Sequence, residues 1–302
     1  MTAAVYLSIY AGVLLFVVGC VVRIVRYART PVHLRWELYP VPHEEPRRAA
    51  HGGSYFEDLN WWTRPRHVNR GSELRAMASE IGFLKALWES NRGLWYSSFL
   101  FHVGLYLTFA VFLLTVARAF APASLSFLRT IQLIAGYFAL ATTLAGALGL
   151  LVRRLTDPEM KNYTAPADLV NLHLFIIVYG LLAAGFLARP AQAASLPELL
   201  RGLLAFDSSV VVGRGFGAGL ILASALLAYI PFTHMAHFIA KYFTYHAVRW
   251  DDRANTRGSS LESAVAPYLT YQPTWSAPHI AGDGRKTWAE VATTNPVAEV
   301  RK

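Results

Sequence analysis

Four histidines lie inside apolar segments of the sequence, where an imidazole is unfavourable unless something binds it. They are His102, His173, His234 and His237. Histidines from facing helices of a bundle can hold a haem iron between them as its two axial ligands. Such iron is coordinatively saturated and suits electron transfer rather than oxygen chemistry. These residues therefore predict a haem site inside a helical bundle.

The apolar segments that carry these histidines are each long enough to cross a bilayer. There are five of them, at roughly 3–22, 94–117, 131–152, 169–188 and 215–240. His102 lies in the second, His173 in the fourth, and His234 and His237 in the fifth. The sequence predicts an all-α integral membrane protein with five transmembrane helices. Helices 2–5 would form a haem-binding four-helix bundle, and the first would be an N-terminal anchor helix.

The positions of the basic residues explain the net charge of +9 without nucleic acid. If the N-terminus lies outside, the inside segments 23–93, 153–168 and 241–302 hold 23 of the 28 Lys and Arg residues. The positive-inside rule then predicts that the N-terminus is outside and the C-terminus is cytoplasmic. All four histidines would lie in the inner half of the bilayer. The basic charge would also attract anionic membrane lipid or an acidic partner.

The first apolar segment has no basic residues before it and no small-x-small cleavage site after it, so it is expected to be retained. Within the loop that follows, Met77, Ile81, Leu84 and Trp88 recur as in an amphipathic helix on the membrane surface. The predicted organisation has four parts: an N-terminal transmembrane helix (1–28), a cytoplasmic loop (29–93), the four-helix haem-binding bundle (94–242) and a cytoplasmic partner-docking tail (243–302).

Cysteine usage limits the cofactors that this chain could hold. The sequence has one cysteine, Cys20, which cannot form a disulfide within the chain, a CxxCH haem attachment or an iron–sulfur cluster. Any haem must be non-covalent haem b, and any iron–sulfur cluster would belong to another subunit.

Other readings of the histidines remain open. A single intramembrane histidine can hydrogen-bond a neighbouring carbonyl. His234 and His237 form an HxxH pair, but zinc would need further ligands nearby. A small transporter would explain the hydropathy but not the common depth of the histidines, and a haem-free quinone-binding membrane anchor would use them for proton transfer. The reduced-minus-oxidised visible spectrum distinguishes these readings.

Three short segments, in this order and spacing, resemble a known family. They are Ser98–Gly104 (SFLFHVG), Thr164–Asp168 (TAPAD) and Pro231–His237 (PFTHMAH). The chain resembles, over about 1–250, the gamma subunit of respiratory nitrate reductase and related cytochrome b subunits of membrane complexes with heterodisulfide-reductase-like iron–sulfur proteins. Gly104 follows His102 closely, and a glycine there would let a flat macrocycle approach the helix.

The resemblance implies specific haem ligands. The inner haem of that family would be held here by His102 and His237. The positions that hold the family's outer haem are Phe112 and Gly219, so both outer ligands are lost. One haem b is therefore well supported, and a second depends on other residues.

His173 and His234 are not explained by the family pattern. They would either hold a second inner-half haem or line a quinone site. Arg92, Arg153, Arg154 and Lys161 are candidates to pair with haem propionates.

The resemblance implies an electron-transfer subunit of a membrane oxidoreductase complex in a prokaryotic inner membrane. The chain would pass electrons between menaquinone or ubiquinone and a cytoplasmic iron–sulfur or flavin subunit. None of its residues is expected to carry out bond-making chemistry alone, so it would not be a complete enzyme.

Overall fold

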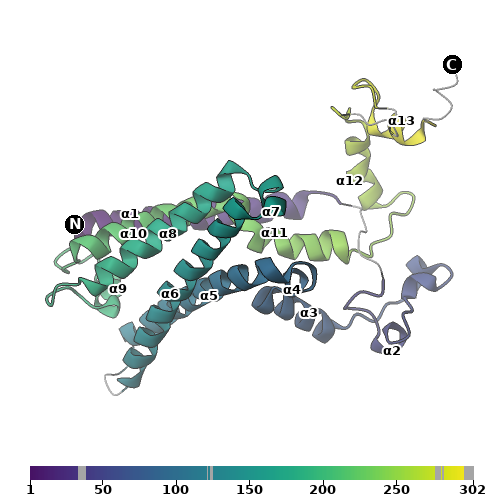
Figure 1. The fold of residues 1–302 in the computed structure, drawn as a ribbon. Coiled ribbons are helices and arrows are strands. Elements are labelled where there is room, and N and C mark those ends of the chain that lie inside the picture. The colour runs from purple at the N-terminus through teal and green to yellow at the C-terminus, as the bar shows by residue number, and fades with distance from the viewer. Residues whose placement is uncertain (33–38, 121, 123–124, 276–279, 281, 296–302) are drawn as a thin grey trace. The chain divides into compact units, whose positions relative to one another are not determined.

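The computed structural model describes residues 1–32, 39–120, 122, 125–275, 280 and 282–295. These residues are largely helical and contain no strand (Figure 1). Five helices among them are long and apolar enough to cross a membrane: α1 (Thr2–Arg29), α5 (Arg92–Phe120), α6 (Phe127–Thr156), α8 (Pro166–Leu187) and α10 (Arg214–Tyr229), whose span continues to Phe232. The predicted all-α, five-helix, multi-pass membrane fold is confirmed.

The chain forms two compact units, which are described separately. The first combines Met1–Val21 with Glu73–Ala236, and the second combines Val22–Ser72 with His237–Lys302. His102, His173 and His234 belong to the first unit. His237 belongs to the second unit, where it begins the segment His237–Lys302. The four-part organisation predicted from the sequence concerns membrane topology, which this division does not test.

Glycines bring α5 and α6 of the first unit into close contact. A Cβ at Gly104 would overlap Thr143, and a Cβ at Gly146 would overlap the backbone of Phe101. Gly104 therefore faces α6, and the expectation that it makes room for a macrocycle is wrong. Thr143 is fully buried at this crossing.

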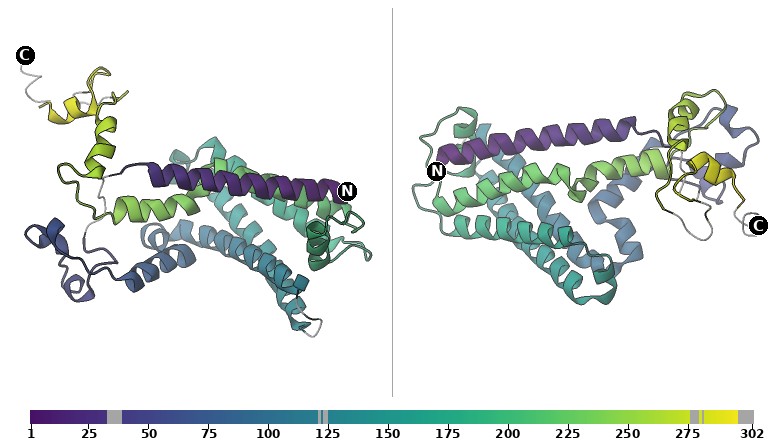
Figure 2. Two further views of the ribbon diagram at one scale, coloured as in Figure 1. Left: turned by 180° about the vertical axis from the view of Figure 1, so that it is seen from behind. Right: turned by 90° about the horizontal axis from the view of Figure 1, so that it is seen from above.

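Helices α8, α10 and α1 complete the first unit. A Cβ at Gly185 of α8 would overlap the backbone of Phe216 at the start of α10. A Cβ at Gly12 of α1 would lie 2.6 Å from the carbonyl oxygen of Ser224 on α10. Figure 2 shows α1 and α10 running side by side. Helix α1 is thus packed against the other spans as far as Val21, and is more than a separate anchor.

The last apolar segment is interrupted. The sequence predicts one helix over 215–240, but α10 ends at Tyr229 and two 3₁₀ turns follow, Ile230–Phe232 and His234–Ala236. Helix α11 (His237–Phe243) then begins. Pro231 causes the break, because it has no N–H and its ring clashes with the preceding helical turn. His234 and His237 therefore do not share one α-helix, and the predicted single helix over 215–240 is wrong.

The predicted surface helix is also interrupted. Helix α3 (Arg70–Phe83) and helix α4 (Lys85–Ser90) are separated by Leu84, whose φ is +51°. The indole of Trp95 donates to the carbonyl of Phe83 at 2.7 Å, and the hydroxyl of Tyr106 donates to that of Ile81 at 2.6 Å. The end of α3 is thus fixed to α5, while the side chain of Ile81 stays exposed.

The second unit has short helices and an aromatic core. Phe56 packs edge-on against Tyr39 at 4.4 Å and against Trp61 at 4.3 Å between ring centroids. The remaining short elements of the two units are α2 (Pro46–Ala49), α7 (Pro158–Asn162), α9 (Leu196–Leu204), α12 (Ser260–Leu269) and α13 (Trp288–Thr293), the 3₁₀ turns Tyr55–Glu57 and Trp61–Thr63, and the π-helical turn Thr244–Arg249.

The α5–α6 contact predicts a difference between two glycine variants. A methyl group at Gly104 would overlap Thr143, whereas nothing lies within 4 Å of a Cβ at Gly180 on α8. We expect Gly104→Ala to destabilise the protein by about 1–3 kcal/mol through overpacking, and Gly180→Ala to have little effect. Thermal unfolding in detergent measures both, and equal melting temperatures would contradict the contact.

Candidate functional site

His102 on α5 has the hydrogen-bond arrangement of a metal-binding histidine. Its ring is half-buried, and Nδ1 lies 2.7 Å from the carbonyl oxygen of Ser98. A carbonyl can only accept, so Nδ1 carries the hydrogen and Nε2 of the neutral ring carries the lone pair. Bonds of this kind orient metal-ligating imidazoles and raise their basicity. The bond to Ser98 therefore orients the imidazole of His102 on α5.

His173 on α8 has the same bond but faces outward. Its Nδ1 lies 2.7 Å from the carbonyl oxygen of Leu169. The ring is exposed, as are Val170 and Ile177, whereas the neighbouring Leu172 is buried. His173 thus carries its lone pair on Nε2, on a face that the rest of the described chain does not cover.

His234 lies in the turn after α10 and contacts the start of α8. Its Nε2 is 3.2 Å from Oδ1 of Asp168 and 3.3 Å from Nδ2 of Asn171, although 57% of the side chain is exposed. An ionised carboxylate can only accept, so Nε2 would donate its hydrogen to Asp168. The Oδ1 atom of Asn171 is buried without a partner. With the hydrogen on Nε2, the contact with Nδ2 of Asn171 is not a hydrogen bond, because both nitrogens would then be donors.

Asp168 connects this histidine to two helices. Its Oδ2 accepts from Nη1 of Arg154 at 3.2 Å and from the backbone N–H of Ala165 at 2.9 Å. Arg154 also donates to the hydroxyl of Thr164 at 3.2 Å. Asp168 thus joins the end of α6, the start of α8 and the turn that contains His234. We call Arg154, Thr164, Asp168, Asn171 and His234 the Asp168 cluster.

The Asp168 cluster brings together two of the three sequence segments that carry the family resemblance. Thr164–Asp168 and Pro231–His237 meet at the contact between Asp168 and His234. Sequence reasoning did not identify Asp168 and Asn171 as partners of His234. The sequence signal for Asp168 was that it ends the segment Thr164–Asp168, at the start of a predicted membrane helix.

Three of the four basic residues proposed for haem propionates have side-chain partners within the protein. Arg153 pairs with Asp157 at 2.8 Å, and Arg154 pairs with Asp168. The guanidinium of Arg92 lies 4.8 Å from the ring centroid of Trp88. Hydrogen bonds from Arg153 and from backbone N–H groups lower the pKa of the Asp157 carboxyl below its ordinary value. Contact with a propionate would have to compete with these interactions.

The residues at the outer-haem positions do not face a common site. The side chain of Phe112 is 52% exposed. Gly219 is buried, and a Cβ there would lie 3.0 Å from the side chain of Leu182 on α8. Neither residue type can ligate iron, and the two positions have different surroundings. The structure thus gives no support to an outer haem at these positions.

The described residues offer few side chains that could ligate a metal ion together. Within the part of the chain that the structure describes, no group of three or more His, Cys, Asp or Glu residues could hold a metal. A b haem needs only two axial ligands, because the porphyrin supplies the other four. Ligation of haem by His102 stays a prediction. His237 is exposed, and its pairing with His102 stays a prediction.

The comparisons with known proteins agree with the resemblance seen in the sequence. A family model, nitrate reductase gamma subunit, matches residues 85–251, which is more than half of the chain. This range runs from the start of α4 to just beyond the π-helical turn, and it contains the four histidines singled out in the sequence and Asp168. The comparisons with curated proteins and with solved structures find no match.

The Asp168 cluster predicts an energetic coupling between Asp168 and His234. In a double-mutant cycle of Asp168→Ala and His234→Ala, we expect a coupling of about 0.5–1 kcal/mol, because each substitution removes the same contact. Thermal unfolding in detergent measures the cycle. Asp157→Ala is the matched control, since Asp157 also begins a helix and pairs with an arginine of α6, and it should not couple to His234. Additive effects of the Asp168 and His234 variants would contradict the contact.

Proposed function

The chain belongs to the nitrate reductase gamma subunit family, and we propose that it carries electrons through a bis-histidine haem b between the quinone pool and a cytoplasmic iron–sulfur or flavin subunit. Family membership makes it a membrane cytochrome b subunit for electron transfer that associates with other redox subunits. The haem ligands, the quinone and the identity of the partner are parts of the proposal. So are the prokaryotic inner membrane and the orientation with the N-terminus outside.

The observation that carries the proposal is the orientation of His102. The carbonyl of Ser98 holds the ring with the lone pair on Nε2, the form that binds iron. His237 is the second axial ligand in this proposal, on the basis of its position six residues after Pro231 in the family pattern. A bound haem b would supply one-electron redox chemistry at this site. The protein would position the haem, exclude water and set its potential.

Quinone chemistry also moves protons, and a haem iron does not accept them. A quinol that loses two electrons also releases two protons, so a group that binds protons near neutral pH is needed beside it, and histidine is that group in proteins. Of the two histidines left unassigned, His234 has the arrangement for this role, because Asp168 holds Nε2–H and Arg154 balances the carboxylate. His173 has its lone pair on Nε2 and is the better candidate for a second haem. A haem-free quinone-binding anchor would use the same Asp168 cluster but would show no haem spectrum.

The axial ligands are tested by histidine variants. His102→Ala and His237→Ala should each abolish the principal haem while the protein still inserts into the membrane. The matched control is His246→Ala, since His246 also places Nδ1 against the carbonyl four residues earlier, at 2.9 Å from Tyr242, but lies in the π-helical turn that follows α11. Haem is quantified as the pyridine haemochrome. Normal haem content in either of the first two variants would refute that ligand.

The two unassigned histidines are tested together with the double variant His173→Ala/His234→Ala. If they ligate a second haem, the variant should lose about half of the bound haem. If they serve the quinone, haem should persist while reduction of the haem by a quinol becomes slower by about 10²–10⁴-fold, the usual effect of removing a general base. Full haem content with normal quinol-linked reduction would leave only a packing role.

A further inference from the structure

The second unit exposes a continuous basic segment that the proposed haem site does not use. All seven residues from Trp62 to Val68 are exposed, and we call this segment the basic strap. It contains Arg64 and Arg66 and no acidic residue. The side chain of Trp62 is 51% exposed, and Leu59, just before the strap, is 79% exposed. Large apolar side chains this exposed beside arginines are typical of an interaction surface.

The N-terminal end of the strap is fixed by its neighbour Trp61. Trp61 is half-buried and packs edge-on against Phe56 at 4.3 Å and Tyr55 at 5.9 Å. Trp62 lies edge-on to Trp61 at 6.0 Å and is 51% exposed. Adjacent tryptophans thus have opposite environments: Trp61 anchors the segment, and Trp62 is presented to the outside.

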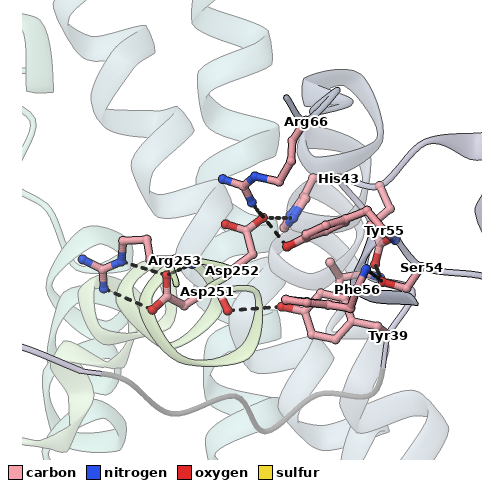
Figure 3. A network of polar contacts seen from close by, with 11 residues as sticks. Tyr39, His43, Ser54, Tyr55, Phe56, Arg66, Asp251, Asp252 and Arg253 are labelled. Atoms are coloured by element: carbon pink, nitrogen blue, oxygen red, sulfur yellow. Dashed lines mark hydrogen bonds and ion pairs between the residues drawn. The ribbon is translucent and has the colours of Figure 1, made fainter. Parts of the chain in front are cut away.

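The C-terminal half of the strap is fixed by the residues that follow α11. Arg66 pairs with the carboxylate of Asp252, donates to the hydroxyl of Tyr55 at 3.3 Å, and lies over the ring of Tyr55 at 5.4 Å (Figure 3). Nε2 of His43 also lies 3.0 Å from Oδ2 of Asp252. The backbone N–H of Asn69 donates to the carbonyl of His43 at 2.7 Å.

These contacts hold the strap in one shape before any partner binds. Residues Pro65–Val68 also line a pocket together with His43 and Tyr55. A surface that is already ordered loses little conformational entropy on binding, so its contacts contribute more fully to affinity. Tryptophan and arginine on such a surface are the residue types that dominate binding energies.

We propose that the basic strap is the docking site for an acidic face of the soluble iron–sulfur or flavin subunit, an inference that rests on the proposed function. Trp62 would enter an apolar pocket of that subunit, and Arg64 would pair with a carboxylate at its edge. A second copy of this chain is disfavoured as the occupant, because a two-fold interface would place the strap's arginines against each other. Anionic lipid requires only positive charge, whereas the strap has a fixed shape made by two distant parts of the chain.

Photo-cross-linking identifies what contacts the strap. A benzoylphenylalanine at position 62 of the full chain in its native membrane should cross-link to an acidic peptide of a protein that contains an iron–sulfur or flavin group. The same residue at position 47, which is exposed on α2, should not give this product. A phospholipid adduct, an adduct to a second copy of the chain, or no adduct at position 62 would overturn the proposal.

Variants then test whether the contact contributes to binding. The double variant Trp62→Ala/Arg64→Glu should retain the cross-linked subunit at least tenfold less well at about 0.1 M salt, and Arg47→Glu should retain it normally. Unchanged retention by the double variant would overturn the proposal. The visible spectrum of the same preparations distinguishes a failure of the proposed function from a failure of the strap proposal alone. A wild-type protein without haem would refute the proposed function, whereas normal haem with unchanged retention would refute only the strap.

Discussion

The carboxylate of Asp168 holds together three parts of the first unit that are far apart in the sequence. It accepts from Arg154 at the end of α6, caps the start of α8 through Ala165, and contacts His234 in the turn after α10. This turn exists because Pro231 ends α10, and a break in a membrane helix leaves backbone groups that nearby polar residues must satisfy. The turn after α10 is therefore held to α6 and α8 through one aspartate.

This arrangement connects the haem proposal to the fold. His234 and His237 are separated by a single 3₁₀ turn, and the contact between His234 and Asp168 fixes the start of that turn. His237, the proposed second ligand, follows this turn directly in the sequence.

The number and placement of the spans could be predicted from sequence, because about 20 apolar residues in a row have few alternatives to a membrane helix. The breaks were less predictable. Leu84 adopts a left-handed conformation that nothing in its residue type suggests, and the apolar run across Pro231 concealed the end of α10. Gly104 was read as space for a cofactor, whereas its neighbour in space is Thr143 of α6. Helix breaks and the surroundings of a glycine depend on contacts between distant segments, which a local sequence pattern does not show.

The histidines of the candidate site could be found from residue type and depth, but their roles could not. His102 and His173 look alike in sequence and make the same bond to a carbonyl, yet one is half-buried and the other faces outward. Asp168 and Asn171 were missed because an acidic residue and an amide near a helix start are ordinary caps. The contact between Arg66 and Asp252 joins residues too far apart for any local pattern to reveal.

Ligation of a haem by two histidines can be tested by electron paramagnetic resonance of the oxidised, purified protein. Two imidazole ligands make ferric haem low-spin, so we expect a low-spin ferric signal that disappears on reduction. That signal should be absent from the His102→Ala variant. A high-spin signal in the wild-type protein, or no haem signal at all, would contradict bis-histidine ligation.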